Sequence, residues 1–395
     1  MKLTDIDIER IRADTPGISQ SCHLLASGSA LMPKQVVDAV VDYTHLEAAM
    51  GGYEAESEQA EKLNAIYHQV AGLIGGKPNE VAILENATVA WCQAFYSLSL
   101  KQGDRVLTCE AEYAANYVAF LQRQKRDGIV IDIVPSDEFG SIDLDALTEM
   151  IDDRVKLIAI TWVPTNGGLV NPAQKVGDIA KNNGIPYLLD ACQAVGQMPI
   201  NVSSIGCDFL TATGRKFLRG PRGTGFLYIR EERLGENEPV MIDHFAAPWT
   251  ARDSYTLRTD ARCFESWENS YALRAGLNAA IQYAVDIGLD AIQDRAWSLA
   301  AYLREQLSSI PGVQTRDIGT VKCAIVSFII EGHEPSAVVK ALRQKDIVIG
   351  ASEPSSTRLD SERRGLPVVL RAAPHYYNTF EEIDRLLSAL NHISR

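Results

Sequence analysis

Between residues 81 and 230 the sequence repeats one pattern: a short apolar run, a polar or glycine-rich turn, and a stretch with helical spacing. Short apolar runs followed by turn residues are typical of buried strands, and apolar residues at helical spacing indicate amphipathic helices. Strands that alternate with helices build a mostly parallel sheet with right-handed crossovers. The pattern predicts an α/β fold that binds its ligand at the carboxyl ends of the strands.

Polar residues stand where these predicted strands end. Because the carboxyl ends of parallel strands meet at one edge of the sheet, residues far apart in the chain should come together there. The residues expected at this edge are Thr88, Tyr113, Thr165, Asp190 and Lys216. Each has an ordinary alternative role, such as a helix cap for Thr88 or core packing for Tyr113, so the convergence is the stronger evidence.

The stretch from 187 to 230 contains an acid and a lysine in a suggestive arrangement. Asp190 ends an apolar strand, and Lys216 follows in a Thr-Gly-Arg-Lys turn. A lysine in a buried site has a lowered pKa and becomes nucleophilic enough to form a Schiff base. Pyridoxal 5'-phosphate needs a lysine for its aldehyde and an acid for its ring nitrogen. The pair predicts this cofactor.

Arg371 ends another apolar strand, within LPVVLRAAPHY. A guanidinium there needs a carboxylate to bind, and bidentate recognition of carboxylates is a property of arginine. Two readings stay open at this point: a carboxylate of the substrate, or an acid of the protein itself.

Length and charge narrow the function further. With 395 residues the chain suits one large and one smaller domain, and 46% hydrophobic with 23% charged residues is ordinary for a folded protein. The net charge is −13 and no block of lysine and arginine occurs, so no nucleic-acid partner is expected. The charged start and the lack of a long apolar run predict a cytoplasmic protein without a membrane span.

The seven cysteines are scattered and never form a C-x-x-C pair, and the seven histidines show no ligand spacing. Reduced thiols and no metal site are expected. No glycine-rich nucleotide-binding motif follows a predicted strand, which disfavours a nucleotide-binding enzyme.

Two further residues are candidates near the N-terminus. Ser29 belongs to a run of small residues with Ser27 and Gly28, which is either a surface lead-in or a place where substrate passes close to the backbone. Tyr53 follows a Gly-Gly break between two predicted helices. Its ring is either packed locally or close to the site of a neighbouring subunit.

The domain division follows from where the alternation ends. An N-terminal arm is predicted over residues 1–30, packing with the smaller domain, and the large cofactor-binding domain over 31–288. The region after residue 230 is loop-rich, with helices from about 271 to 285 and 289 to 307. Residues 289–395 are predicted to form a small α+β domain, and the end of the chain within it is expected to hold two or three strands interleaved with two helices.

These features carry a resemblance that covers about residues 20 to 392. The chain resembles fold-type I pyridoxal-phosphate enzymes of the class V aminotransferase and cysteine desulfurase group. Its landmarks are the D-x-x-Q segment at Asp190 to Gln193, the lysine turn from Thr213 to Lys216 followed by GPRGTGFLY, and Arg371 followed by Tyr-Asn-Thr. The resemblance implies a three-layer fold with a mostly parallel seven-stranded sheet and a homodimer whose sites are shared between subunits.

Site roles follow from the same resemblance. Lys216 would form the Schiff base and move protons, Asp190 would hold the ring nitrogen protonated, and Gln193 would bond the ring's phenolic oxygen. Tyr113 stands where desulfurases have a stacking histidine that also acts as acid or base. Arg371 would bind the α-carboxylate of an amino-acid substrate. The phosphate would be held by the backbone of Ala87 and by Thr88, Thr213 and Arg215.

One departure from the desulfurases bears on the reaction. A desulfurase forms a persulfide on a loop cysteine shortly before the carboxylate-binding arginine. The stretch GASEPSSTRLDSERRGLP contains no cysteine, and the nearest preceding one, Cys323, lies in an apolar strand. Cysteine desulfuration is therefore disfavoured at this stage.

Other segments, HLEAAMGGYEAE, AEYAANY, FESWENS and RKFLRGPRGTG, resemble a branch with hercynylcysteine sulfoxide lyases and isopenicillin N epimerase-like proteins. This favours C–S β-lyase activity on a cysteine conjugate or sulfoxide, with transamination or epimerisation as the alternatives. A catalytically silent scaffold is disfavoured by the intact Asp190, Gln193 and Lys216. Tyr53, Glu268 and Asn269 are the residues expected to reach across a dimer interface.

Overall fold

A seven-stranded sheet forms the centre of the protein, whose computed structural model describes residues 3–395. The strand order is β2-β8-β7-β6-β5-β3-β4, and β8 runs antiparallel to both of its neighbours while the other pairs are parallel. The strands are β2 (Val81–Leu84), β3 (Arg105–Cys109), β4 (Val130–Val134), β5 (Val155–Thr161), β6 (Tyr187–Asp190), β7 (Phe209–Thr213) and β8 (Gly225–Ile229). The predicted mostly parallel seven-stranded sheet is confirmed.

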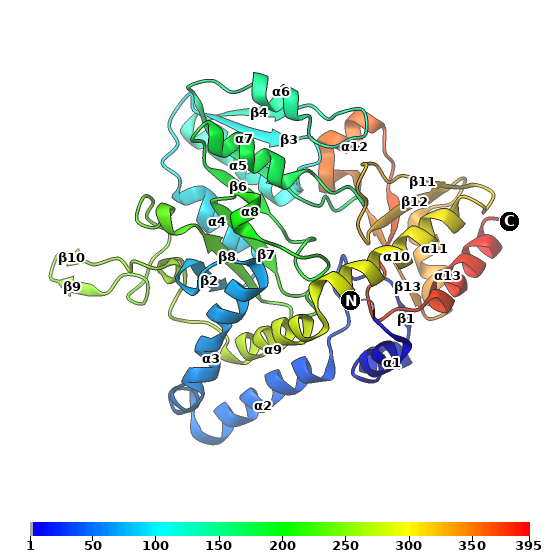
Figure 1. Cartoon of the computed structure of the whole chain (residues 1–395), viewed down its shortest axis with the longest axis horizontal. Coiled ribbons are helices and arrows are strands. Elements are labelled where there is room, and N and C mark those ends of the chain that lie inside the picture. Colours follow the sequence, from blue (N-terminus) through cyan, green and yellow to red (C-terminus); the bar gives the residue numbers. More distant parts are fainter. Residues whose placement is uncertain (1–2) are drawn as a thin grey trace.

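Helices cover both faces of this sheet and give the predicted three layers (Figure 1). One face packs on an aromatic cluster that includes Trp91, Phe95 and Phe120, and the other face packs on a larger apolar core. The first face carries α4 (Ala87–Ser97) and α5 (Ala114–Asp127), and the other helices that follow strands are α6 (Leu144–Glu149), α7 (Ala173–Asn182) and α8 (Val202–Ile205). Most strand residues outside the edge strand β4 are buried, because helices cover both faces.

The N-terminal segment connects distant parts of the chain. It contains α1 (Asp5–Ala13), β1 (Cys22–His23), α2 (Lys34–Met50) and α3 (Gly52–Ile74). The predicted break between the last two helices lies at Gly51, which has a φ of 97° that favours glycine. Strand β1 pairs in parallel with β13 (Ile347–Val348), and Arg12 forms an ion pair with Glu382 at 3.0 Å. The segment thus contacts the C-terminal part of the chain.

Residues after β8 include a hairpin that the sequence did not predict. Strands β9 (Trp249–Ala251) and β10 (Ser254–Tyr255) pair antiparallel, and the hairpin projects from the body of the protein (Figure 1). The helix α9 (Tyr271–Ile287) then packs beside α2 and α3, in the lower part of the view in Figure 1. The hairpin strands are exposed, so no apolar alternation marked them in the sequence.

The C-terminal part builds a second sheet of four antiparallel strands, in the order β11-β12-β15-β14. Its elements are α10 (Leu289–Leu307), β11 (Val313–Thr315), β12 (Val326–Ile330), α11 (Pro335–Arg343), β14 (Gly350–Ser352), α12 (Arg358–Arg364), β15 (Val369–Ala372) and α13 (Phe380–Ile393). The predicted content of two or three strands and two helices was too small because β11 and β14 are only three residues long. The domain limits at residues 30 and 288 stay predictions.

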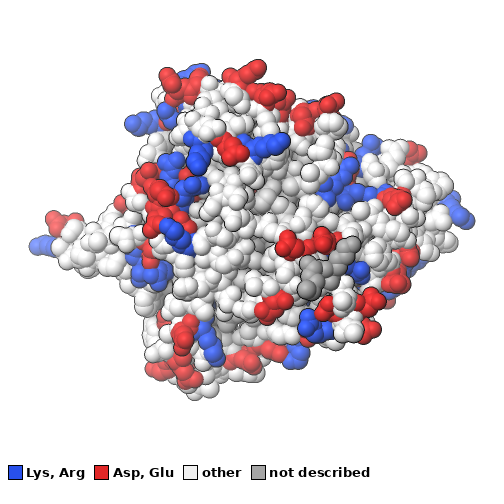
Figure 2. Space-filling view, viewed as in Figure 1, with Lys and Arg blue, Asp and Glu red and all other residues white. Residues whose placement is uncertain are grey.

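Charge is distributed without a single dominant patch on the face shown in Figure 2. Acidic and basic side chains are interspersed around the rim of this face, and the surface between them is largely uncharged. Within residues 3–395, no helix is long and apolar enough to span a bilayer, and no cluster of histidine, cysteine and carboxylate side chains with metal-binding geometry is found.

Candidate active site

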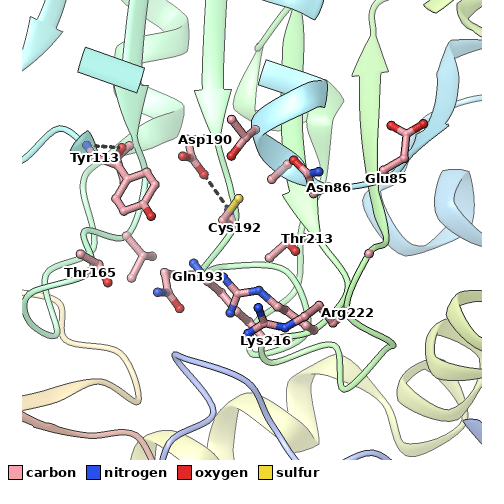
Figure 3. Close-up of a pocket in the computed structure, with 16 residues that line it drawn as sticks. Glu85, Asn86, Tyr113, Thr165, Asp190, Cys192, Gln193, Thr213, Lys216 and Arg222 are labelled. Carbon is pink, nitrogen blue, oxygen red and sulfur yellow. Dashed lines mark hydrogen bonds between the residues drawn. The ribbon is translucent and has the colours of Figure 1, made fainter. Parts of the chain in front are cut away.

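A cavity of about 440 Å³ lies at the carboxyl ends of the parallel strands. Strands β5, β6 and β7 end there with Thr161, Asp190 and Thr213, and α4 begins beside them (Figure 3). Nine of the predicted site residues line it: Ala87, Thr88, Tyr113, Thr165, Asp190, Gln193, Thr213, Arg215 and Lys216. The convergence expected from the topology is therefore present in the structure.

Asp190 presents a buried, fixed carboxylate to this cavity. One of its oxygens accepts a hydrogen bond from the backbone N–H of Cys192 at 2.9 Å (Figure 3). The other accepts one from the Asn116 amide at 2.9 Å. The residue is 5% exposed. A carboxylate held in this way can pair with a protonated ring nitrogen, which is the group that pyridoxal phosphate requires.

Lys216 provides the amine. Burial lowers its pKa, although Cys192 and Asp190 act in the opposite direction. A lowered pKa increases the fraction of neutral amine, the nucleophilic form that attacks an aldehyde. Its Nζ lies 6.0 Å from the centre of the Tyr113 ring, so the amine and a flat aromatic surface share the cavity.

The start of α4 forms an anion cradle. Asn86 caps the helix by accepting a hydrogen bond from the Val89 N–H at 2.9 Å, and the first N–H groups of a helix have no acceptor within the helix. The N–H groups of Ala87 and Thr88 are therefore available to a phosphate. Two guanidinium groups, Arg215 and Arg222, line the same cavity.

Gly225 lets strand β8 pass directly behind this cradle. A Cβ at this position would lie 2.7 Å from the Ala212 carbonyl oxygen and 2.9 Å from the Ala87 nitrogen, both of them backbone atoms. Gly225→Ala is therefore expected to lower the free energy of unfolding by about 1–3 kcal/mol and to weaken cofactor binding. Urea denaturation of the cofactor-free protein and a cofactor titration measure the two effects.

Gly72→Ala is the matched control, because a Cβ there meets no atom within 4 Å. Its position in α3 predicts a stabilisation of about 0.5–1 kcal/mol, since alanine is a better helix former than glycine. If Gly225→Ala kept the stability and the cofactor affinity of wild type, a glycine would not be required where β8 passes behind the start of α4.

Gln193 carries an unsatisfied polar atom in the same cavity. Its Nε2 donates to the Ser27 carbonyl at 3.1 Å, while its buried Oε1 has no partner among the described residues. Unpaired buried polar atoms are costly, and a bound ligand commonly satisfies them. The acid, the amine, the free helix amides, the aromatic ring and this amide together fit pyridoxal phosphate.

Arg371 lies next to the cavity, behind Thr165. Its Nη1 donates to the Thr165 carbonyl at 2.9 Å and to the hydroxyl of the same residue, whereas its Nε has no partner among residues 3–395. Burial, and to a smaller extent Arg215, lower its pKa to about 10. No acid of the described chain forms an ion pair with it, which favours a carboxylate of the substrate over an acid of the protein.

Two further predicted residues, like Arg371, do not line the cavity. Ser29 does not line it, although the preceding residue, Gly28, accepts a hydrogen bond from Arg215. Tyr53 lies in a separate cavity together with Glu268 and Asn269. Their roles stay predictions.

Sequence reasoning also missed residues that the fold brings to the site. Arg222 and Cys192 line the cavity, and Asn116 contacts Asp190. Arg222 could have been found from its place in the GPRG turn after Lys216. Asn116 gave no signal of its own, because its partner is 74 residues away in the sequence.

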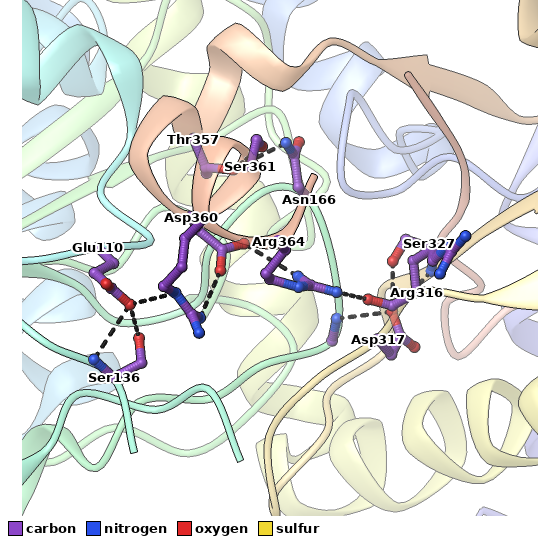
Figure 4. Close-up of polar contacts among 12 residues, drawn as sticks. Glu110, Ser136, Asn166, Arg316, Asp317, Ser327, Thr357, Asp360, Ser361 and Arg364 are labelled. Carbon is purple, nitrogen blue, oxygen red and sulfur yellow. Dashed lines mark hydrogen bonds and ion pairs between the residues drawn. The ribbon is translucent and has the colours of Figure 1, made fainter. Parts of the chain in front are cut away.

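The segment between β14 and β15 is docked on the body of the protein (Figure 4). Asn166 donates to the Thr357 hydroxyl at 2.9 Å and accepts from Ser352 at 2.6 Å. Asp360 bonds to Arg364 at 3.1 Å, and its N–H donates to the Glu110 carbonyl at 3.1 Å. Polar contacts thus hold this segment, which contains no cysteine, against the body of the protein.

Comparison with known proteins places this site in a family. The family model described as aminotransferase class-V matches residues 22–386. The fold and the site define a pyridoxal-phosphate enzyme of fold type I. The chain belongs to the class V aminotransferase family, and its cofactor is pyridoxal 5'-phosphate.

Two relatives match this chain over nearly their whole length. The chain is 30% identical to a probable cysteine desulfurase of Methanothermobacter thermautotrophicus, covering 98% of each chain. It is 31% identical to a probable cysteine desulfurase of Xylella fastidiosa, covering 98% of this chain and 95% of the relative. The apo structure of a cysteine desulfurase from Thermococcus onnurineus NA1 superposes with a TM-score of 0.92 at 26% identity, covering 100% of this chain and 99% of the other.

These relatives correct the predicted reaction. The sequence favoured a β-lyase acting on a cysteine conjugate or sulfoxide and disfavoured desulfuration. Both predictions are wrong, because the relatives are named cysteine desulfurases rather than sulfoxide lyases or epimerases. The physical reason is that the thiolate that attacks the sulfur atom can be supplied by another molecule as well as by a loop of the chain. The missing thiol therefore bears on where the sulfur goes.

Proposed function

We propose that the protein removes sulfur from cysteine, in the manner of a cysteine desulfurase, and passes it to a thiol that comes from outside this chain. The observation that carries the proposal is the full-length similarity to probable cysteine desulfurases. The geometry supports it, because an amine of lowered pKa lines the cavity and an arginine without an acid partner bonds to Thr165, another residue of its lining.

The roles in this proposal follow from position. Arg371 binds the α-carboxylate of the substrate with the guanidinium edge that the protein leaves without a partner. Lys216 would hold the cofactor through its amine and would move the proton at the substrate's Cα. Tyr113 stacks on the ring. The other contacts to the cofactor come from Ala87, Thr88, Thr165, Asp190, Gln193, Thr213 and Arg215.

The proposed step forms one bond and breaks one. The incoming thiolate attacks the sulfur of the bound cysteine, so an S–S bond forms while the Cβ–S bond breaks. The electron pair of the broken bond stays on the carbon side, and pyridoxal phosphate, when bound, would supply the electron sink for it. Protonation of Cβ then gives alanine. Cysteine and a thiol are consumed, alanine and a persulfide are formed, and no separate oxidant is needed.

Cys192 is the one cysteine that lines the cavity among residues 3–395. Burial and the neighbouring Asp190 raise its pKa well above the usual value for a thiol. A protonated thiol is a poor nucleophile, because the thiolate is the reactive form. The remaining cysteines do not line this cavity, so the acceptor thiol is proposed to come from another molecule.

Product analysis tests this function. The holoenzyme is expected to convert cysteine to alanine when dithiothreitol is supplied, with sulfide released in equal amount, and to form little alanine without a thiol. Pyruvate and ammonia as the main products would contradict the proposal and indicate elimination. Conversion of the cofactor to its amine form, restored by a keto acid, would instead indicate transamination.

We further propose that the protein forms a homodimer with sites shared between subunits and is divided into domains at residues 30 and 288. Tyr53, Glu268 and Asn269 line one small cavity, which supports a common role at the interface. Tyr53 is 74% exposed and Trp249, on the projecting hairpin, is 76% exposed. Large aromatic side chains at such positions are typical of protein interfaces.

A further inference from the structure

A second buried carboxylate lies behind Asp190. Glu112 follows strand β3 and is 3% exposed, and no lysine, arginine or histidine of the described chain forms an ion pair with it. Its oxygens accept hydrogen bonds from the Thr108 hydroxyl at 2.9 Å, the Tyr113 N–H at 2.9 Å and the Thr161 hydroxyl. Burying a carboxylate without a partner cation costs free energy, unless a neighbouring group is stabilised by the negative charge.

Asn116 connects this carboxylate to Asp190. Its Nδ2 donates to Glu112 at 2.8 Å and to Asp190 at 2.9 Å, so both amide hydrogens are used by carboxylates. The amide is 4% exposed and lies one helical turn after Glu112, at the start of α5. This contact orients the Asp190 carboxylate, whose other oxygen accepts from the Cys192 N–H.

The charge state of Glu112 depends on what Asp190 binds. Burial raises the pKa of Glu112 to about 7, the hydrogen bonds from Thr161 and Asn116 lower it, and the negative charge of Asp190 raises it. Cys109 and Tyr187 are the other titratable groups affected by its charge. A cation placed on the far side of Asp190 offsets the repulsion between the two acids and favours the ionised form of Glu112.

We propose that Glu112 is a positioning residue that acts through Asn116 on Asp190 and, with its negative charge, helps to keep the ring nitrogen of the bound cofactor protonated. It does not touch the cofactor itself. The Asp190–Asn116–Glu112 chain orients the first carboxylate and places a second one behind it. The proposal concerns the cofactor and does not depend on which substrate or acceptor the enzyme uses.

The test follows the ring nitrogen directly. Wild type and variants are loaded with pyridoxal phosphate that carries nitrogen-15 in its ring, and the nitrogen chemical shift is measured against pH. Glu112→Gln keeps the size of the side chain and an acceptor for Asn116 but removes the charge. Asn116→Ala breaks the chain. Asn171→Ala is the matched control. Asn171 is also a buried amide, and it donates to the carbonyl of Thr161, but it does not contact Asp190.

In Glu112→Gln and Asn116→Ala the ring nitrogen is expected to lose its proton at a pH at least about one unit lower than in wild type, a tenfold change in the equilibrium. Asn171→Ala should titrate like wild type. Melting curves of the cofactor-free variants establish folding, and Glu112→Gln alone decides if Asn116→Ala does not fold. An unchanged titration in a folded Glu112→Gln protein would overturn the proposal, whatever its melting temperature.

Discussion

Lys216→Ala is expected to abolish the covalent link to the cofactor and to lower turnover of cysteine by at least about 10³-fold. The amine is the nucleophile that forms the Schiff base and the base that moves the Cα proton, so one substitution removes both functions. In wild type, borohydride should fix the cofactor to the chain and remove its visible absorption band. In Lys216→Ala the cofactor should wash out after the same treatment.

Lys101→Ala provides the comparison, because Lys101 is exposed and far from the cavity. It should keep wild-type turnover and the covalently fixed cofactor. A Lys216→Ala protein that still holds the cofactor covalently after borohydride treatment would contradict the assignment of this lysine.

Arg371→Leu should act on the substrate and leave the cofactor bound. Loss of the guanidinium leaves the substrate carboxylate without its partner, which costs about 2–5 kcal/mol, or roughly 30-fold to several thousand-fold in kcat/KM. The visible band of the cofactor should persist, because the side chain bonds to Thr165 and does not line the cavity. Steady-state kinetics and an absorption spectrum of the same sample measure both effects.

A charge-matched comparison is Arg358→Leu. Arg358 is exposed on α12 and pairs with Glu362 at 3.2 Å on the surface, an interaction worth little. Its kinetics should equal those of wild type. If Arg371→Leu kept wild-type kcat/KM for cysteine, the carboxylate would have to bind elsewhere.

The sequence was a good guide to the architecture where burial is strong. Strands such as β5 and β6 are buried over nearly their whole length, so their apolar runs and following turns predicted the sheet. The direction of β8 was not predictable, because a buried strand reads the same in either orientation. The hairpin β9–β10 and the three-residue strands β11 and β14 are too exposed or too short to leave a periodic signal.

The site was predictable to the extent that topology determines it. Asp190 and Thr213 end neighbouring strands, so their meeting follows from the parallel sheet alone. Glu112 and Asn116 were missed because their importance lies in bonds across the fold, which no local pattern reports. Side-chain packing determines these contacts.

The reaction was the least predictable part. No cysteine lies between β14 and β15, but this absence was wrongly used to disfavour desulfuration as a whole. Under the proposed function, Lys216, Asp190 and the cofactor would activate the substrate carbon, and the sequence indicated all three. Accepting the sulfur depends on a thiol that another molecule can supply, and a single sequence carries no information about that molecule.

The location of the transferred sulfur tests the central claim most directly. The holoenzyme and its Cys192→Ala variant are incubated with cysteine and a small thiol, and the chain is then analysed by intact-mass spectrometry while alanine is quantified. We expect alanine from both proteins, a persulfide on the small thiol, and no added sulfur on the chain. A chain that gains one sulfur atom on a cysteine of its own, with alanine formation lost when that cysteine is replaced, would contradict the account.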